Sequence, residues 1–140
     1  MFRELGVRPA ALLDRHDRVY RRWAARRMRS GEFWAYLVEA PDGTPLGSGS
    51  VWLQPQQPRP FFLAYRELPY VLSMYTEPSA RGRGVATRIL EEMIEWARRA
   101  GYPRIFLHAS KFGRPVYARA GFQPGNEMRL DFDRLRRRAR

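Results

Sequence analysis

The spacing of apolar residues predicts an N-terminal helix followed by a β-hairpin. Residues 10–29 carry apolar side chains at helical intervals between arginines, which is typical of an amphipathic helix that ends at Gly31. Aromatic and β-branched residues at Phe33–Glu39 predict a strand. The turn Pro41-Asp42-Gly43 connects that strand to a second one over Leu46–Leu53.

An irregular loop and a buried strand follow the hairpin. Four prolines between Gln54 and Pro69 disfavour regular structure there. Phe61, Phe62 and Tyr65 in this loop either line a binding cleft or only attach the loop to the core. Tyr70–Thr76 is an almost unbroken apolar run, which predicts a central strand covered on both faces.

The C-terminal half predicts a strand–helix–strand crossover and two smaller elements. An amphipathic pattern predicts a helix over Gly84–Ala100, and Ile105–Ala109 predicts a strand parallel to the central one. A short helix is expected from Gly113 to Gly121, with Pro115 in its first turn. Alternation of apolar and polar residues over Glu127–Phe132 predicts a last strand with one buried face.

Composition narrows the class of protein. With 140 residues, 44% of them apolar, the chain can enclose one core, so we expect a single domain over residues 1–140 with a basic tail at 133–140. The absence of cysteine excludes thiol nucleophiles and disulfides, and with two histidines no metal site is expected. Neither a run of about 18 apolar residues nor a signal-peptide pattern is present, so we expect a cytoplasmic protein without a membrane partner.

The net charge of +12 suggests an anionic partner. Nucleic acid is the weaker candidate, because the basic residues are arginines spread along the whole chain with Lys111 as the single lysine. The basic run Arg134–Arg140 is either a solvated end or a contact to an anionic partner. A positive field also attracts small polyanionic ligands.

The junction between the central strand and its following helix is suited to bind phosphate. The N-terminus of a helix presents unpaired N–H groups and a partial positive charge. Two glycines allow a phosphate to approach the backbone, two arginines add positive charge, and a small alanine leaves room, all within Arg81, Gly82, Arg83, Gly84, Val85 and Ala86. A glycine-rich turn of this kind can also serve packing alone.

Two motifs resemble those of a known family. Arg81-x-x-Gly84-x-Ala86, after a strand and before an amphipathic helix, resembles the cofactor motif of the GCN5-related N-acetyltransferases. Tyr117-Ala118-Arg119-Ala120-Gly121-Phe122 is similar to the family's Tyr-x-x-x-Gly-Phe. A narrower group shares Leu107-His108-Ala109-Ser110, Gly113-Arg114-Pro115 and Asn126-Glu127-Met128-Arg129-Leu130. The resemblance spans Phe33 to Phe132 and implies an α+β fold with a mixed, twisted central sheet flanked by helices.

The resemblance also implies the cofactor and its binding residues. Acetyl-CoA would be bound through its pantetheine arm by main-chain groups of Met74, Tyr75 and Thr76, and its pyrophosphate by the N–H groups of residues 82–86. Ser110 occupies the position where family members often have an asparagine that contacts the pantetheine.

Tyr117 is the candidate general acid, because a phenol can protonate the thiolate that leaves when an amine attacks a thioester. Glu77, at the end of the central strand, is the candidate base. His108 can titrate near neutral pH, but on an apolar strand it is more typical of a histidine satisfied within the core.

The expected function is transfer of an acetyl group from acetyl-CoA to a primary amine of a small molecule or peptide. The alternatives are a non-catalytic acyl-CoA-binding regulatory domain and a basic nucleic-acid-binding module. Family members usually begin with a strand and a helix ahead of the region that resembles Phe2–Gly6, and we expect this chain to start after them. We therefore expect an exposed sheet edge at Phe33–Glu39 and a homodimer that covers it.

Overall fold

The computed structural model describes Glu4, Gly6 and residues 9–60, 63–64 and 66–130, and all structural statements refer to these residues. The three aromatic residues of the loop (Phe61, Phe62 and Tyr65) and the basic tail at 133–140 lie outside them. The elements are, in chain order, α1 (Ala10–Arg29), β1 (Phe33–Glu39), β2 (Pro45–Pro55), β3 (Glu67–Thr76), the 3-10 turn η1 (Pro78–Ala80), α2 (Val85–Arg99), β4 (Phe106–Leu107) and α3 (Arg114–Arg119).

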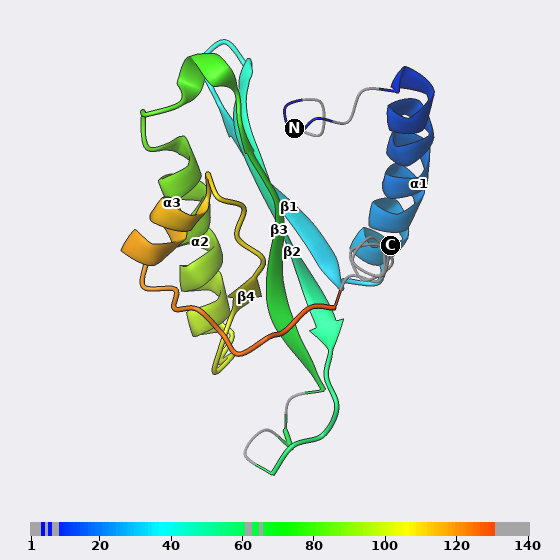
Figure 1. Ribbon diagram of the computed structural model, residues 1–140, viewed down its shortest axis with the longest axis vertical. Coiled ribbons are helices and arrows are strands. Elements are labelled where there is room, and N and C mark those ends of the chain that lie inside the picture. The colour runs from blue at the N-terminus through cyan, green and yellow to red at the C-terminus, as the bar shows by residue number, and fades with distance from the viewer. Residues whose placement is uncertain (1–3, 5, 7–8, 61–62, 65, 131–140) are drawn as a thin grey trace, which may run out of the picture.

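The strands form one mixed sheet in the order β1-β2-β3-β4. The first three strands are antiparallel, and β4 is parallel to β3, with α2 in the connection between them. β1 lies at one edge of the described sheet, as the sequence predicts. Helices α2 and α3 lie on one side of the sheet and α1 lies on the other (Figure 1).

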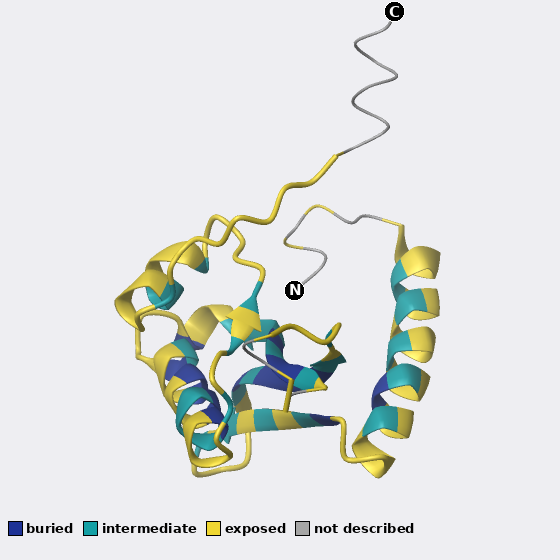
Figure 2. Cartoon of the chain, turned by 90° about the horizontal axis from the view of Figure 1, so that it is seen from below, coloured by how far each residue is buried: buried dark blue, intermediate teal, exposed yellow. Residues whose placement is uncertain are grey.

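The core lies between the sheet and α2. Ile89 and Met93 of α2 are almost fully buried against Val51 of β2 and Val71 of β3. Their burial follows from the helical spacing of apolar residues on one face of α2, and it supplies most of the hydrophobic stabilisation of this layer. Figure 2 shows the buried positions concentrated in the sheet and α2. The buried face of α2 therefore holds the junction between β3 and α2 in place.

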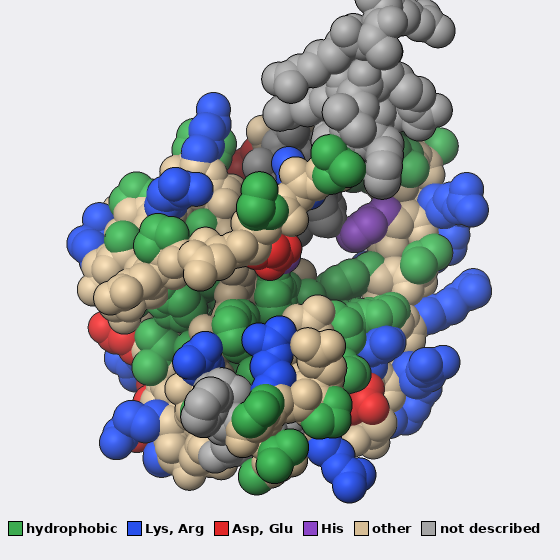
Figure 3. Space-filling model, turned by 60° about the horizontal axis from the view of Figure 1, so that its bottom comes forward, with side chains coloured by type: hydrophobic (Ala, Val, Ile, Leu, Met, Phe, Trp, Pro, Cys, Tyr) green, Lys and Arg blue, Asp and Glu red, His purple; other side chains and the backbone are tan. Residues whose placement is uncertain are grey.

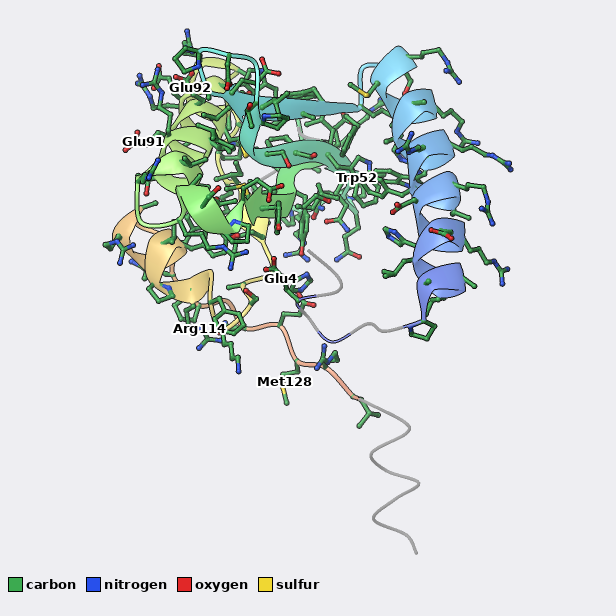
Figure 4. All side chains as sticks on the ribbon, turned by 90° about the horizontal axis from the view of Figure 1, so that it is seen from above. Glu4, Trp52, Glu91, Glu92, Arg114 and Met128 are labelled. Atoms are coloured by element: carbon green, nitrogen blue, oxygen red, sulfur yellow. The ribbon has the colours of Figure 1, made fainter. Side chains whose placement is uncertain are left out.

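Helix α1 is attached more loosely. Ala24 is its one buried residue. Trp23 packs edge-on against Phe33 of β1 and Trp52 of β2, with ring centroids 5.2 and 5.5 Å apart. In Figure 4, Trp52 lies between the sheet and α1. Aromatic contacts along one stripe, and not a closed core, hold this helix on the sheet.

Most of the predicted elements are confirmed, and one is wrong. The N-terminal helix, the hairpin, the parallel pair around α2 and the short helix after Gly113 are present. Glu127–Leu130 are not in a strand, and Met128 and Leu130 are 94% and 63% exposed. An alternating pattern yields a strand only where a neighbour accepts its hydrogen bonds, and the adjacent β4 extends over just two residues. Within the described residues, no helix has the length and apolarity needed to cross a membrane.

Candidate active site

A bulge interrupts the central strand β3. Ser50 pairs with Leu72 and Ser48 pairs with Tyr75, so Gly49 alone faces two residues of β3, Ser73 and Met74. Ser73 has a φ of 56°, in the left-handed region that residues with a side chain rarely adopt. A bulge of this kind bends the strand and increases its local twist.

Beyond the bulge, β3 and β4 separate. Their pairing consists of Tyr70 with Phe106 and Val71 with Leu107, whereas β3 continues to Thr76. The main-chain groups of Met74, Tyr75 and Thr76 that face away from β2 are therefore not used in a ladder with β4. An extended ligand that carries amide groups can pair with such an open strand edge.

The end of β3 leads through η1 into the predicted phosphate-binding turn. Gly82 and Gly84 have φ values of 74° and 78°, and a Cβ added to either would meet no atom within 4 Å. Gly84 is the N-cap of α2, no side chain caps this end, and the first intrahelical bond runs from the Arg88 N–H to the Gly84 carbonyl. The N–H groups of Val85 and Ala86 precede that bond, so the turn combines open space with free donors.

Arg81 is oriented by two oxygen acceptors. Its Nε donates to the Thr76 carbonyl at 3.1 Å and its Nη2 donates to the Glu4 carboxylate at 2.6 Å. Tyr75 donates its hydroxyl to the other oxygen of Glu4 at 3.0 Å. These bonds, first that from Arg81 and then that from Tyr75, hold the pKa of Glu4 below its usual value. The guanidinium thus links the end of β3 to the turn before α2.

Ser110 precedes α3, and Tyr117 lies within that helix. The Ser110 hydroxyl accepts a hydrogen bond from the Gly113 N–H at 3.1 Å and so stabilises the entry to the helix. Tyr117 packs against Phe122 with ring centroids 6.0 Å apart. A Cβ on Gly113 would lie 2.7 Å from the Tyr117 ring, so glycine is needed for this close contact. Burial raises the pKa of the Tyr117 phenol, which keeps it protonated at neutral pH.

The two candidate bases have different surroundings. Glu77 follows β3 directly, and its N–H donates to the Leu46 carbonyl at 2.9 Å, which fixes its main chain at the end of the strand. The interpretation of His108 as a core histidine is wrong, because its side chain is 71% exposed. His108 follows the short strand β4 and bonds to Tyr70 and Glu127. Strand β4 consists of two residues and ends before His108, so the strand does not carry the His108 side chain into the core.

Two features of this region were missed from the sequence, the bulge in β3 and the partnership of Glu4 with Arg81. Ser73 is a polar residue in the middle of the apolar run Tyr70–Thr76, and that interruption is one signal for the bulge. Gly49 within the predicted strand is a second signal, since glycine in a strand often marks a bulge or a close approach. The partnership of Glu4 with Arg81 joins positions 77 residues apart and has no local signal.

The opened strand, the open glycine turn and the half-buried phenol all belong to one mixed α+β domain. Residues 3–122 match the Acetyltransferase (GNAT) family, and the chain belongs to this family. A GCN5-related N-acetyltransferase from Ralstonia eutropha JMP134 has a similar structure, with a TM-score of 0.80 and 30% identity, over 94% of this chain and 84% of that one. A predicted acetyltransferase from Clostridium acetobutylicum, crystallised with acetyl-CoA, has a TM-score of 0.79 and 26% identity over 93% and 82%.

Two curated relatives share a name. The glucosamine 6-phosphate N-acetyltransferase of Trypanosoma brucei brucei is 28% identical over 106 residues, which cover 75% of this chain and 69% of the relative. A probable glucosamine 6-phosphate N-acetyltransferase 2 of Oryza sativa subsp. japonica is 28% identical over 94 residues. The chain spans about half (54%) of that rice protein.

Proposed function

We propose that this protein transfers an acetyl group from acetyl-CoA to a primary amine by direct attack, without a covalent enzyme intermediate. The observation that carries the proposal is the continuity of the site: the bulged, opened end of β3 leads through η1 directly into the open glycine turn at the start of α2. An extended amide-bearing arm that ends in a pyrophosphate matches both halves of this surface.

Acetyl-CoA fits the residues that are present. Main-chain groups of Met74, Tyr75 and Thr76 would bind the pantetheine, together with the Ser110 hydroxyl. The N–H groups from Gly82 to Ala86 would bind the pyrophosphate. The space beside Gly82 and Gly84 is open, because a Cβ added to either glycine would meet no atom within 4 Å. A net charge of +12 increases the local concentration of such a polyanion.

When bound, acetyl-CoA supplies a carbonyl that an amine can attack and a thiolate leaving group. Tyr117 donates the proton that the thiolate needs, and its raised pKa keeps that proton available at neutral pH. N–H groups along the open edge of β3 polarise the carbonyl. Holding donor and acceptor together supplies much of the rate enhancement. Glu77 is a candidate base because of its position at the end of β3, where its main chain is fixed.

Binding and turnover measurements test this proposal. Calorimetry measures the affinity for acetyl-CoA, and release of free thiol measures turnover with a panel of primary amines. The panel includes D-glucosamine 6-phosphate because two curated relatives carry the name of its acetyltransferase. We expect micromolar binding, turnover with at least one amine, and a loss of turnover in Tyr117→Phe. Tyr102→Phe is the matched control, since Tyr102 packs on Trp96 at the far end of α2.

The two alternatives predict different results. A regulatory acyl-CoA-binding domain would bind acetyl-CoA without turnover, and Tyr117→Phe would have no effect. A nucleic-acid-binding module would bind DNA with steep salt dependence and would not bind coenzyme A.

A further inference from the structure

Three titratable side chains, Tyr70, His108 and Glu127, form a cluster to which the function proposed above assigns no role. The hydroxyl of Tyr70 is hydrogen-bonded to Nδ1 of His108, and the two rings are 5.5 Å apart. Nε2 of His108 lies 3.0 Å from Oε1 of Glu127. Tyr70 belongs to β3, His108 follows β4, and Glu127 belongs to the C-terminal segment. Tyrosine, histidine and glutamate therefore form a continuous hydrogen-bonded chain.

The cluster is on the face of the sheet opposite to α2. Tyr70 pairs directly with Trp52 across β2 and β3, so the two side chains share one face. Trp52 contacts Trp23 of α1, whereas Val71, next along β3, is in the core beneath α2. Figure 3 shows the surface hollowed between α1 and the sheet, with apolar side chains on its floor and an acidic side chain at its rim. Tyr70 also precedes the point where β3 and β4 separate.

The partners of His108 define the direction of its hydrogen bonds. An ionised carboxylate only accepts, so the proton on the imidazole belongs on Nε2, facing Glu127. Nδ1 then carries a lone pair and accepts the Tyr70 O–H. The Tyr70 oxygen retains lone pairs of its own for an incoming donor. The order of the three groups is that of a catalytic triad, in which a carboxylate orients a histidine and the histidine takes a proton from a hydroxyl.

We propose that Tyr70 receives the proton of the acceptor's ammonium group and passes its own proton to His108, which Glu127 orients and stabilises as an imidazolium. This step rests on the function proposed above. One N–H bond of the ammonium breaks as an O–H bond forms on Tyr70, while the original O–H bond of Tyr70 breaks and an N–H bond forms on Nδ1. The positive charge moves from the acceptor to His108, and the amine gains the lone pair that it needs for attack.

The raised pKa of Tyr70 is consistent with a relay. Burial is the main cause, and the charge of Glu127 is the second. Both disfavour a tyrosinate, so Tyr70 stays protonated and exchanges one proton for another. In the described part of the chain, the titratable side chains in contact with His108 are Tyr70 and Glu127. Tyr70 is thus the catalytic residue, and the other two position and polarise it.

The pH dependence of kcat/KM tests the relay. His108→Gln removes the proton acceptor of the relay, and we expect it to abolish the acidic limb of the profile and to lower the rate with a strongly basic amine roughly 10²-fold. With an alkoxyamine, whose amino group is already neutral at pH 7, the rate should remain within about threefold of wild type, because no ammonium has to be deprotonated before the attack. Tyr70→Phe should behave in the same way. KM for acetyl-CoA should not change in either variant.

Two control variants make the result specific. His16→Gln removes the other imidazole of the chain, which bonds to Asp17 on α1, and should retain the acidic limb. Glu77→Gln tests the alternative base. If Glu77→Gln removes the acidic limb and His108→Gln retains it, the relay is overturned. If no amine is acetylated by the wild-type protein, the proposed function fails and the relay fails with it.

A measurement independent of turnover completes the test. Nitrogen NMR of the imidazole should show a proton on Nε2 of His108 and none on Nδ1, and Tyr70→Phe should shift the Nδ1 resonance. A proton on Nδ1 in the neutral ring would overturn the relay. Acetyl-CoA affinity and melting temperature establish that each variant is folded. If a variant does not fold, the wild-type pH profile and imidazole spectrum decide the question.

Discussion

Gly47→Ala is predicted to weaken acetyl-CoA binding more than it weakens the fold. Gly47 lies in β2 opposite Thr76 of β3. A Cβ at this position would lie 2.6 Å from Cγ1 of Val85 and 2.8 Å from the carbonyl oxygen of Tyr75. Val85 is the first residue of α2, and the Tyr75 oxygen belongs to the main chain, so neither can move aside as the end of a long side chain could. The added methyl group must displace the end of β3 or the start of α2.

The expected magnitudes follow from these contacts. Overpacking of this kind costs about 1–3 kcal/mol. Replacing glycine restricts the unfolded chain and returns about 0.4–1 kcal/mol, so the net loss of stability is roughly 0–2.6 kcal/mol. Misplacing one or two main-chain hydrogen bonds to the pantetheine costs about 1–3 kcal/mol. That loss corresponds to acetyl-CoA affinity lower by roughly 5- to 150-fold.

Calorimetry with acetyl-CoA and thermal melting measure the two effects separately. Gly125→Ala is the matched control, because a Cβ there would meet no atom within 4 Å. We expect the control to bind and melt as the wild type does. Gly47→Ala that binds acetyl-CoA within twofold of wild type would refute the assignment of this end of β3 to the pantetheine.

Three further predictions concern the acid, the turn and the sheet edge. Tyr117→Phe should lower kcat about 10²-fold without changing acetyl-CoA affinity. Because burial raises the pKa of Tyr117, the kcat of the wild-type protein should fall off at a higher pH than the pKa of an exposed phenol. Gly84→Ala forces a φ of 78° on a residue with a side chain and should cost about 1–2 kcal/mol, measured by denaturant unfolding; an unchanged midpoint would contradict the left-handed turn. Sedimentation at micromolar concentration should show a dimer that Leu37→Lys dissociates, since Leu37 is 55% exposed on edge strand β1; a wild-type monomer would exclude this interface.

Local signals predicted most of the helices and strands and the glycine turn before α2. Helix α2 begins after glycines in left-handed conformations and ends before Gly101, whose φ is 79°. Both boundaries depend on the preferences of a few consecutive residues, so the sequence reveals them. The parallel pairing of β3 and β4 follows from the helix between them, because a crossover of that length returns the chain in the same direction.

Features that depend on distant partners could not be predicted. Tyr70 and His108 are separated by 38 residues, and His108 and Glu127 by 19, so no periodicity indicates that they meet. The same limit explains the wrong strand at Glu127–Leu130, where the residue pattern was suitable but no described neighbour supplies a ladder. A short local pattern specifies what a segment can form, whereas its partner decides whether it does.

The bulge at Ser73 connects the two faces on which donor and acceptor would bind. Met74, beside it, packs against the core under α2, whereas the Ser73 hydroxyl is hydrogen-bonded to the Tyr20 hydroxyl of α1 at 3.0 Å. Helix α1 buries only Ala24, so its position can adjust at small cost compared with α2, which buries five residues. If acceptors bind between α1 and the sheet, differences among them are accommodated by the loosely packed helix. The cofactor site keeps its geometry because it belongs to the buried layer.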